Sequence, residues 1–143
     1  ITVITNGVSA AEANTMLQDM AQNLAAMAKD LNIVIFIFCH LKANEGNISK
    51  DQRTKKYAEG KYWDLGMCPH EMGGTISSNQ FAGSRAMMRS ASLMLGLEAN
   101  KDEDLDPAVR NTRRIRILED REFGETGSFQ IFWNKATTRF MEA

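Results

Sequence analysis

Apolar residues near the start of the chain repeat with the spacing of one helix face. Ser9 and Glu12 have the spacing of a capping box, in which the serine oxygen accepts a backbone N–H and the glutamate reaches back. The apolar positions that follow are Ala13, Met16, Leu17, Met20, Leu24, Met27, Ala28 and Leu31. This pattern predicts a long helix that begins near Ser9 and ends at Asn32.

The next segment, residues 33–38, reads IVIFIF and is apolar on both faces. Continuous apolarity with β-branched and aromatic residues is typical of a strand covered on both sides, as in a parallel sheet flanked by helices. A shorter apolar run, Ile1–Ile4, precedes the helix and suggests the end of another buried strand. The order strand, helix, strand predicts a doubly wound α/β domain.

Residues 43–76 show no sustained period and contain five glycines, which indicates a functional or mobile loop. Beyond it, we expect a second helix that starts near Ser77 or Ser78 and reaches Ala91. A buried strand is expected at 93–97, followed by a charged loop, 101–106, that closes at Pro107.

The last third of the chain has the pattern of antiparallel strands. Residues 114–117 alternate between arginine and isoleucine, 129–133 alternate loosely, and Gly124 and Gly127 mark turns. We therefore predict two or three antiparallel strands. Because no repeat or composition change divides the chain, residues 1–143 are interpreted as one domain or a large part of one.

Composition limits the classes of function. The 143 residues are 43% apolar and 24% charged with a net charge of −1, so any nucleic-acid contact must come from a local basic segment. No apolar run approaches the roughly 20 residues needed to cross a bilayer, so no membrane partner is expected. Two cysteines favour a reducing cytoplasm, and a start at Ile1 rather than Met suggests an excised segment.

A polar cluster, residues 39–42, follows directly after the run 33–38. In open α/β sheets, ligands bind beyond the carboxyl ends of the strands, where His40 could donate a hydrogen bond to a phosphate. The alternative is a strand end that is capped by a histidine with its hydrogen bonds satisfied within the protein.

Four stretches of the chain resemble, in the same order, segments of phage primase–helicases, which are relatives of DnaB and of the mitochondrial helicase Twinkle. They read IVIFIFCHLK, FAGSRAMMRSASLMLGLEAN, RIRILEDREFGETG and FWNKATTRFME. The likeness covers about residues 9–42 and 80–142 and is lost in the loop 43–76. Each motif alone is weak, but four in register are specific.

The resemblance implies roles for particular residues. His40 matches the family's γ-phosphate sensor, and Lys42 matches a lysine that contacts the DNA backbone. Arg121 matches the arginine finger, which reaches the nucleotide of a neighbouring subunit in trans. The alternatives are a solvated surface lysine at 42, and an exposed arginine at 121 that pairs with Glu119, Asp120 or Glu122.

Three further positions match residues of the family. Trp133 matches an aromatic residue on which the nucleotide base stacks, although an aromatic residue there could equally belong to the core. Gly83 and Ser84 match a pair near a DNA-facing helix start, where small residues allow close approach to a phosphate. A simple helix-entry role is the alternative for this pair.

The chain also departs from the family pattern at three positions. Glu119 stands where the family usually has a lysine, Ala99 where an arginine commonly contacts the base, and Arg89 where a glutamine is usual. These changes put the details of nucleotide sensing in doubt.

No G-x-x-x-x-G-K-[ST] motif occurs in the sequence, so the backbone loop that binds the β- and γ-phosphates is missing. The resemblance thus implies a truncated RecA-like P-loop NTPase core that lacks its P-loop segment. ATP or another NTP, together with Mg²⁺, is expected to bind the full-length parent, whereas this fragment alone is expected to be inactive. The parent would be a hexameric DNA-replication helicase that moves on single-stranded DNA, in a host cytoplasm if phage-encoded.

Between Lys42 and Gly66 the chain carries six basic and four acidic residues, with Lys50 among the basic ones. Tyr57, Tyr62 and Trp63 are interleaved with them, and basic groups with stacking faces are what single-strand binding requires. We therefore predict that the loop 43–76 faces DNA. The alternative is a mobile surface loop whose aromatic side chains pack onto the core.

The sequence also allows a zinc site, a recombinase-like ATPase or a non-catalytic module. Cys39, His40, Cys68 and His70 could supply four zinc ligands, but adjacent residues on a strand point to opposite faces, which disfavours a metal site. A RecA- or RadA-type recombinase-like ATPase would share the fold, but the CHLK and DREFGETG stretches are closer to phage helicases. A non-catalytic DNA-binding or assembly module is the third hypothesis.

Overall fold

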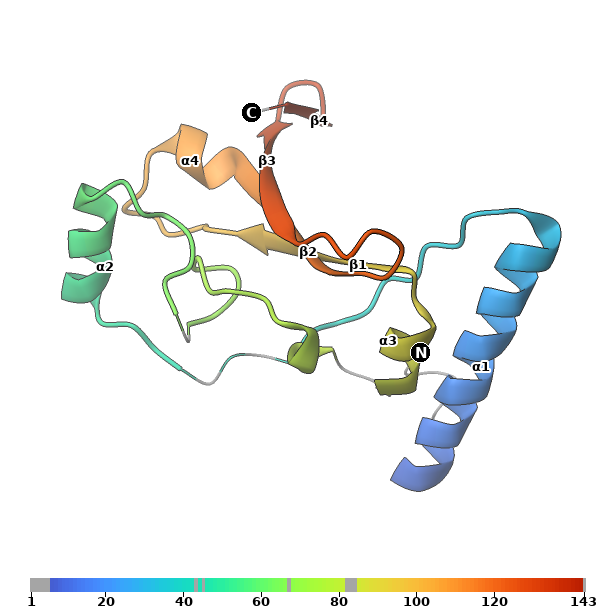
Figure 1. Ribbon diagram of the computed structural model, residues 1–143. Helices are drawn as coiled ribbons and strands as arrows, with labels where there is room; N and C mark the ends of the chain where they lie inside the picture. Colours follow the sequence, from blue (N-terminus) through green and yellow to red (C-terminus); the bar gives the residue numbers. More distant parts are fainter. Residues whose placement is uncertain (1–5, 43, 45, 67, 82–84, 143) are drawn as a thin grey trace.

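The computed structural model describes residues 6–42, 44, 46–66, 68–81 and 85–142. Within this part of the chain, one long helix stands apart from a four-stranded sheet, and a long connecting segment crosses between them (Figure 1). The helices are α1 (Ala10–Leu31), α2 (Lys50–Ala58), α3 (Arg85–Ser90) and α4 (Pro107–Asn111), with a short 3₁₀ helix, η1 (Ser78–Gln80). The strands are β1 (Leu93–Ala99), β2 (Thr112–Asp120), β3 (Gly127–Asn134) and β4 (Arg139–Glu142).

The predicted long helix is confirmed as α1. The Ser9 side chain accepts from the Glu12 N–H at 3.3 Å, and a Glu12 carboxylate oxygen accepts from the Ser9 N–H at 2.9 Å. The helix ends at Asn32, which adopts the left-handed conformation with φ of 51°. The face that contains Leu17 and Ala21 is buried, and α1 packs against α3.

The predicted buried strand at 33–38 is wrong for this structure. These residues belong to no strand, and Val34, Phe36 and Phe38 are 78%, 75% and 91% exposed. A strand is held by hydrogen bonds to a neighbouring strand, and the segment has no such neighbour among the described residues. The parallel sheet of a doubly wound domain is therefore not formed here, and the suggested strand Ile1–Ile4 lies outside the described residues.

The four strands form one antiparallel sheet in the order β1-β2-β3-β4, which confirms the α/β class and the predicted C-terminal antiparallel strands. Along β1, Met94, Gly96 and Glu98 point to a covered face, while Leu93, Leu95 and Leu97 point to an exposed one. One face of β1 is thus buried by other parts of the described chain, and its other face is open.

The covered face lies beneath residues 61–77, which were predicted as part of an irregular loop. Ile76 packs over Gly96, where an added Cβ would lie 3.0 Å from an Ile76 methyl carbon. The backbone of Gly73 donates to the Ala99 carbonyl at 3.1 Å, and Met72 bridges to Asn100. A small core of buried Leu65, Cys68, Ile76 and Met94 is the result.

Two helices, α2 and α4, were not predicted from the sequence, and the segment that contains η1 and α3 differs from its prediction. The helix α2 has no buried residue and hence no apolar period, although its capping box at Ser49 and Gln52 was readable in the sequence. Pro107 begins α4 rather than only closing a loop. The helix expected from Ser77 or Ser78 to Ala91 is instead η1 followed by α3, and residues 82–84 between them lie outside the described part.

The close approach of two chain segments at Gly74 makes a testable prediction. A Cβ at Gly74 would lie 2.0 Å from the Cys68 carbonyl oxygen, a backbone atom, so Gly74→Ala forces the two segments apart. We expect a loss of about 2–4 kcal/mol in the free energy of unfolding, measured by urea denaturation followed by circular dichroism.

The matched control is Gly60→Ala. Gly60 has φ of 71° but nothing within 4 Å of an added Cβ, so only backbone strain of about 1–2 kcal/mol is expected. Equal losses for the two variants would contradict the packing described here.

Candidate functional site

The backbone at Leu41 and Lys42 is held from two sides. On one side, the Lys42 N–H donates to the Gln80 carbonyl at 2.6 Å, and Leu41 bridges to Phe81. On the other side, the ring of His70 lies with Nε2 3.2 Å from the Lys42 carbonyl oxygen. A carbonyl only accepts, so Nε2 carries the proton and donates.

Asn44 completes the same junction. Its side-chain amide donates to the Cys68 carbonyl at 3.0 Å, and its side-chain oxygen accepts from the Gln80 amide. Residues 68–70 and 80–81, far apart in sequence from 41–44, therefore enclose this segment. The side chains of His40 and Lys42 are both exposed, and the held backbone of Lys42 presents its ammonium group to solvent.

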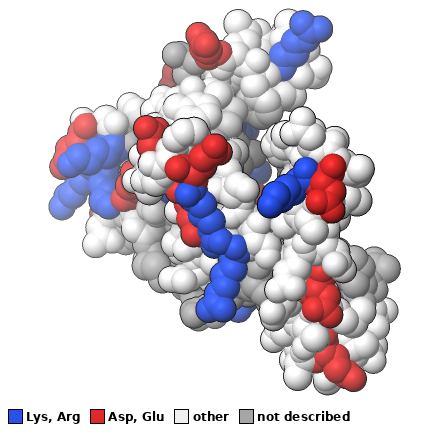
Figure 2. Space-filling view, turned by 45° about the vertical axis from the view of Figure 1, so that its right-hand side comes forward, with Lys and Arg blue, Asp and Glu red and all other residues white. Residues whose placement is uncertain are grey.

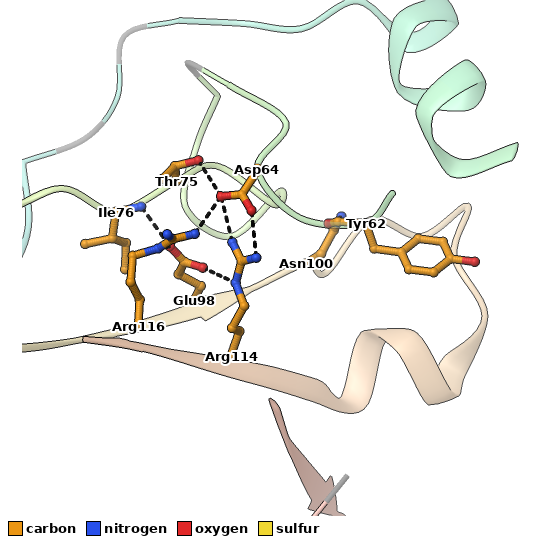
Figure 3. Close-up of polar contacts among 8 residues, drawn as sticks. All are labelled: Tyr62, Asp64, Thr75, Ile76, Glu98, Asn100, Arg114 and Arg116. Atoms are coloured by element: carbon orange, nitrogen blue, oxygen red, sulfur yellow. Dashed lines mark hydrogen bonds and ion pairs between the residues drawn. The ribbon is translucent and has the colours of Figure 1, made fainter. Parts of the chain in front are cut away.

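The segment 61–76 is anchored to the sheet by a cluster of four charged side chains: Asp64, Glu98, Arg114 and Arg116 (Figure 3). Glu98 on β1 has no exposed surface, and its two oxygens accept from Arg114 Nε at 2.5 Å and Arg116 Nε at 2.7 Å. Asp64, from the loop, accepts from both terminal nitrogens of Arg114 at 2.8 and 2.9 Å and from Arg116 at 2.6 Å. We call these four residues the loop anchor.

Neighbouring groups complete the loop anchor. The Ile76 N–H donates to Glu98 at 3.0 Å, and the Thr75 hydroxyl donates to Asp64 at 3.1 Å. The Arg114 guanidinium also lies 5.2 Å from the ring centroid of Trp63, within cation–π range. Two carboxylates and two guanidiniums balance in charge, and this balance allows charged groups to be buried.

The pKa of the Asp64 carboxyl is lowered, first by its hydrogen bonds with Arg114, against the opposing effect of burial, and then by the charges of Arg114 and Arg116. Its ionised form is therefore the form that the folded protein stabilises. The loop anchor was not predicted from the sequence. A signal was present, because Arg114 and Arg116 are two residues apart on a strand and so share one face. Two arginines on a covered face require carboxylate partners.

A second set of contacts holds α2 to the loop that follows β1. Arg53 pairs with the buried Asp102 at 3.1 Å, and the Tyr57 hydroxyl donates to the same carboxylate at 2.9 Å. Burial, together with the bond to Asp102, raises the pKa of Tyr57 to about 12. Lys50, predicted to contact DNA, forms an ion pair with Asp104 at 3.0 Å on the surface.

The aromatic side chains of the loop 43–76 pack against protein rather than standing free. Tyr57 and Tyr62 have ring centroids 6.0 Å apart, and Trp63 lies under Arg114. All three are half-buried. For these three rings, the structure therefore agrees with the alternative that the aromatic side chains of the loop pack against the protein. A DNA-facing role for the basic residues of the loop remains a prediction.

Arg121 follows the end of β2 and is bonded within its own chain. Its Nε donates to Glu119 at 3.0 Å, and its terminal nitrogens donate to the carbonyls of Met88 and Arg89 at the end of α3. The pairing with Glu119 is the alternative that the sequence left open, and Arg121 also caps α3. A finger role for this exposed side chain remains a prediction.

The remaining candidates are placed apart from this junction. Trp133 on β3 packs against Phe140 on β4, with ring centroids 4.9 Å apart. Gly83 and Ser84 lie outside the described residues. Cys68 is buried, and burial raises the pKa of its thiol. Within the described ranges, no three or more histidine, cysteine or acidic side chains gather into a metal-binding group.

Charge is mixed over the surface. On the face that Figure 2 shows, basic and acidic side chains alternate over short distances, and no broad basic area is present. A contact with a polyanion would therefore depend on local groups such as Lys42. Within the described part of the chain, no helix combines the length and apolarity required to cross a bilayer.

Comparison with solved structures and with known sequences shows which proteins the chain is similar to. Its fold is similar to a solved ATPase domain, with a TM-score of 0.62 and 14% identity over 96% of this chain and 39% of that one. In sequence, it is 24% identical over 127 residues to a DNA helicase/primase of Enterobacteria phage T3, which is 89% of this chain and 18% of that protein. No family model matches.

These similarities confirm the resemblance to phage replicative helicases that the sequence motifs indicated. The chain spans less than half of each of the two proteins.

The loop anchor predicts how stability depends on pH. The pKa of Asp64 is lowered in the folded state, so its stabilisation is complete above the unfolded value of about 3.9 and is lost as the pH falls through the folded value. We expect Asp64→Asn to lower the free energy of unfolding by about 1–2 kcal/mol at pH 7. The difference from wild type should stay constant down to about pH 5 and shrink below about pH 4.

Urea unfolding at a series of pH values measures this difference. The control is Asp30→Asn, at the exposed end of α1, where no ion pair forms among the described residues and little change is expected at any pH. A deficit for Asp64→Asn that persists unchanged at pH 3 would contradict the ionic role of Asp64.

Proposed function

We propose that this chain is part of the motor of an ATP-dependent, ring-forming replicative DNA helicase that moves on single-stranded DNA and unwinds duplex. Its similarity to a phage DNA helicase/primase and its ATPase-domain fold support the class. The observation that carries the proposal is the exposed side chain of Lys42 on a backbone held from both sides, two residues after the exposed side chain of His40.

The residues present do not fit ATP and Mg²⁺ by themselves. The sequence lacks a phosphate-binding loop, and the described residues include no cluster of three or more potential metal ligands. In the proposal, the remainder of a full-length protein binds nucleotide and metal. The part assigned to this chain is to respond to the terminal phosphate and to grip DNA.

His40 is proposed to donate a hydrogen bond to the terminal phosphate of the nucleotide. A gain or loss of that bond shifts His40, and Lys42 follows two residues later on the same backbone. Because His70 and Gln80 hold the Lys42 backbone, movement there is transmitted to residues 68–81 instead of being absorbed by a loose loop. An exposed ammonium group at Lys42 suits contact with any DNA phosphate, regardless of base sequence.

Arg121 is proposed to act on the nucleotide of a neighbouring subunit. To do so, its guanidinium must leave Glu119 and the carbonyls at the end of α3. The Glu119 pair is exposed on both sides, and pairs of this kind contribute only about 0–1 kcal/mol. The ion pair therefore opposes release only weakly compared with the stabilisation that a guanidinium gives to charge developing on a transferred phosphoryl group.

DNA-dependent ATPase and unwinding assays on the full-length protein test the proposal. The same assays on Arg121→Ala test the finger role of this residue. With this change, nucleotide binding should persist, while DNA-stimulated hydrolysis falls on the order of 10³-fold. Arg139→Ala, on β4 and without an ion pair among the described residues, is the matched control and should retain activity. Full turnover by the assembled Arg121→Ala protein would overturn the finger assignment.

Lys42→Ala tests the DNA contact. Removal of one phosphate contact should weaken binding to oligonucleotides of any sequence and reduce the slope of log affinity against log salt by about one. Fluorescence anisotropy with labelled oligonucleotides at several salt concentrations measures both quantities. Lys29→Ala, an exposed lysine on α1, should leave them unchanged. An unaltered salt slope for Lys42→Ala would remove this residue from the interface.

A further inference from the structure

A pocket of about 220 Å³ opens between α4 and the turn that joins β3 to β4. The residues that line it are Lys101, Pro107, Arg110, Asn111, Arg113 and Lys135. Four of these six carry a positive charge, and none is acidic. They come from three separate parts of the chain, so only the folded structure brings the charges together.

Three of the four cations lack a carboxylate partner among the described residues. One Arg113 nitrogen donates to the backbone carbonyls of Arg110 and Thr112, and a carbonyl satisfies the hydrogen bond without neutralising the charge. The Nε of Arg110 is buried and has no hydrogen-bond partner among the described residues. Lys135 forms no ion pair in the same part of the structure.

The fourth cation, Lys101, is only weakly compensated. Its ammonium lies 3.3 Å from the Glu71 carboxylate, and both side chains are more than half exposed. A pair of this kind is screened by water and leaves the lysine available to a stronger anion. Burial, meanwhile, lowers the pKa of Arg113, which reflects a guanidinium partly removed from water.

We infer that this pocket binds a phosphate group. Guanidinium groups donate to phosphate in a planar, bidentate geometry, and lysines add charge without fixing orientation. The amide of Asn111 supplies an uncharged donor in the same wall. The choice of phosphate over another anion rests on the proposed function, because a DNA helicase binds polynucleotides and nucleotides, and both carry phosphate groups.

The pocket is separate from the junction at Lys42. Figure 1 places α4 and the β3–β4 turn on one side of the sheet, and η1, whose Gln80 holds Lys42, on the other. A polynucleotide phosphate bound in the pocket would be a second point of contact, whereas a free nucleotide phosphate would define a small-molecule site. Both sources present the same chemistry to the arginines.

Two exposed pocket lysines can be changed with little risk to folding: Lys101→Gln and Lys135→Gln, with Lys29→Gln on α1 as the control. Fluorescence anisotropy with a labelled dT20 oligonucleotide tests the polynucleotide source, and calorimetric titration with inorganic tripolyphosphate tests the free-phosphate source. We expect each pocket variant to weaken the affinity for at least one probe about threefold to tenfold. For dT20, the salt slope should fall by about one.

The outcomes separate the alternatives. A loss confined to dT20 assigns the pocket to a polynucleotide, and a loss confined to tripolyphosphate assigns it to a free phosphate. Unchanged affinity for both probes, or an equal loss for Lys29→Gln, would overturn the inference. If Lys42→Ala still weakens dT20 binding in that case, the proposed function stands without the pocket. If Lys42→Ala also has no effect, the DNA contact of the proposed function fails as well.

Discussion

A carboxylate with no exposed surface, Glu98, lies near the C-terminal end of β1, and much of the structure follows from the need to neutralise it. An unpaired buried charge costs several kcal/mol, so the neighbouring strand supplies Arg114 and Arg116 on the same face. Two arginines on one carboxylate leave a positive excess, which Asp64 from the loop removes. The loop is thereby bound to the sheet by charge balance rather than by a large apolar core.

Attachment of the loop has consequences at a distance. With Asp64 in place, Ile76 lies over β1, and the turn that carries Cys68 and His70 reaches the Lys42 carbonyl and the Asn44 side chain. Strand β2, which bears the two arginines of the loop anchor, also leads into Arg121. The segments proposed to grip DNA and to reach a neighbouring nucleotide are thus both attached to the same two strands. Contacts through this sheet therefore connect the two segments, which gives the proposed coupling a physical route.

Basic residues in this protein fall into two groups that net charge does not distinguish. Arg53, Arg114 and Arg116 are paired with carboxylates and hold the chain together. Among the described residues, Lys42 and three cations of the pocket beside α4 have no carboxylate partner, and the fourth, Lys101, has one only in an exposed pair. A chain with a net charge of −1 can therefore still present local sites that attract phosphate.

Local signals in the sequence were sufficient where the chain makes its own contacts. The capping box at Ser9, the apolar period of α1 and the alternation of β2 each concern residues close in sequence, and all were confirmed. The motifs around His40, Arg121 and Trp133 also indicated the class of protein to which the chain is similar. What no local pattern could give was the state of residues 33–38, because a strand forms only when a partner edge lies beside it, and none does among the described residues.

The same reason applies to the site. Sequence alone marked His40 and Lys42 as polar residues after an apolar run, but His70, which holds the Lys42 carbonyl, lies 28 residues away. Asp64 and Arg114 are 50 residues apart, and the four cations of the pocket come from three segments. Charges pair through space, over a few ångströms, and their positions in the chain do not reveal which will meet. The sequence determined which groups were available, and the tertiary structure decided which of them were neutralised and which were left to bind something else.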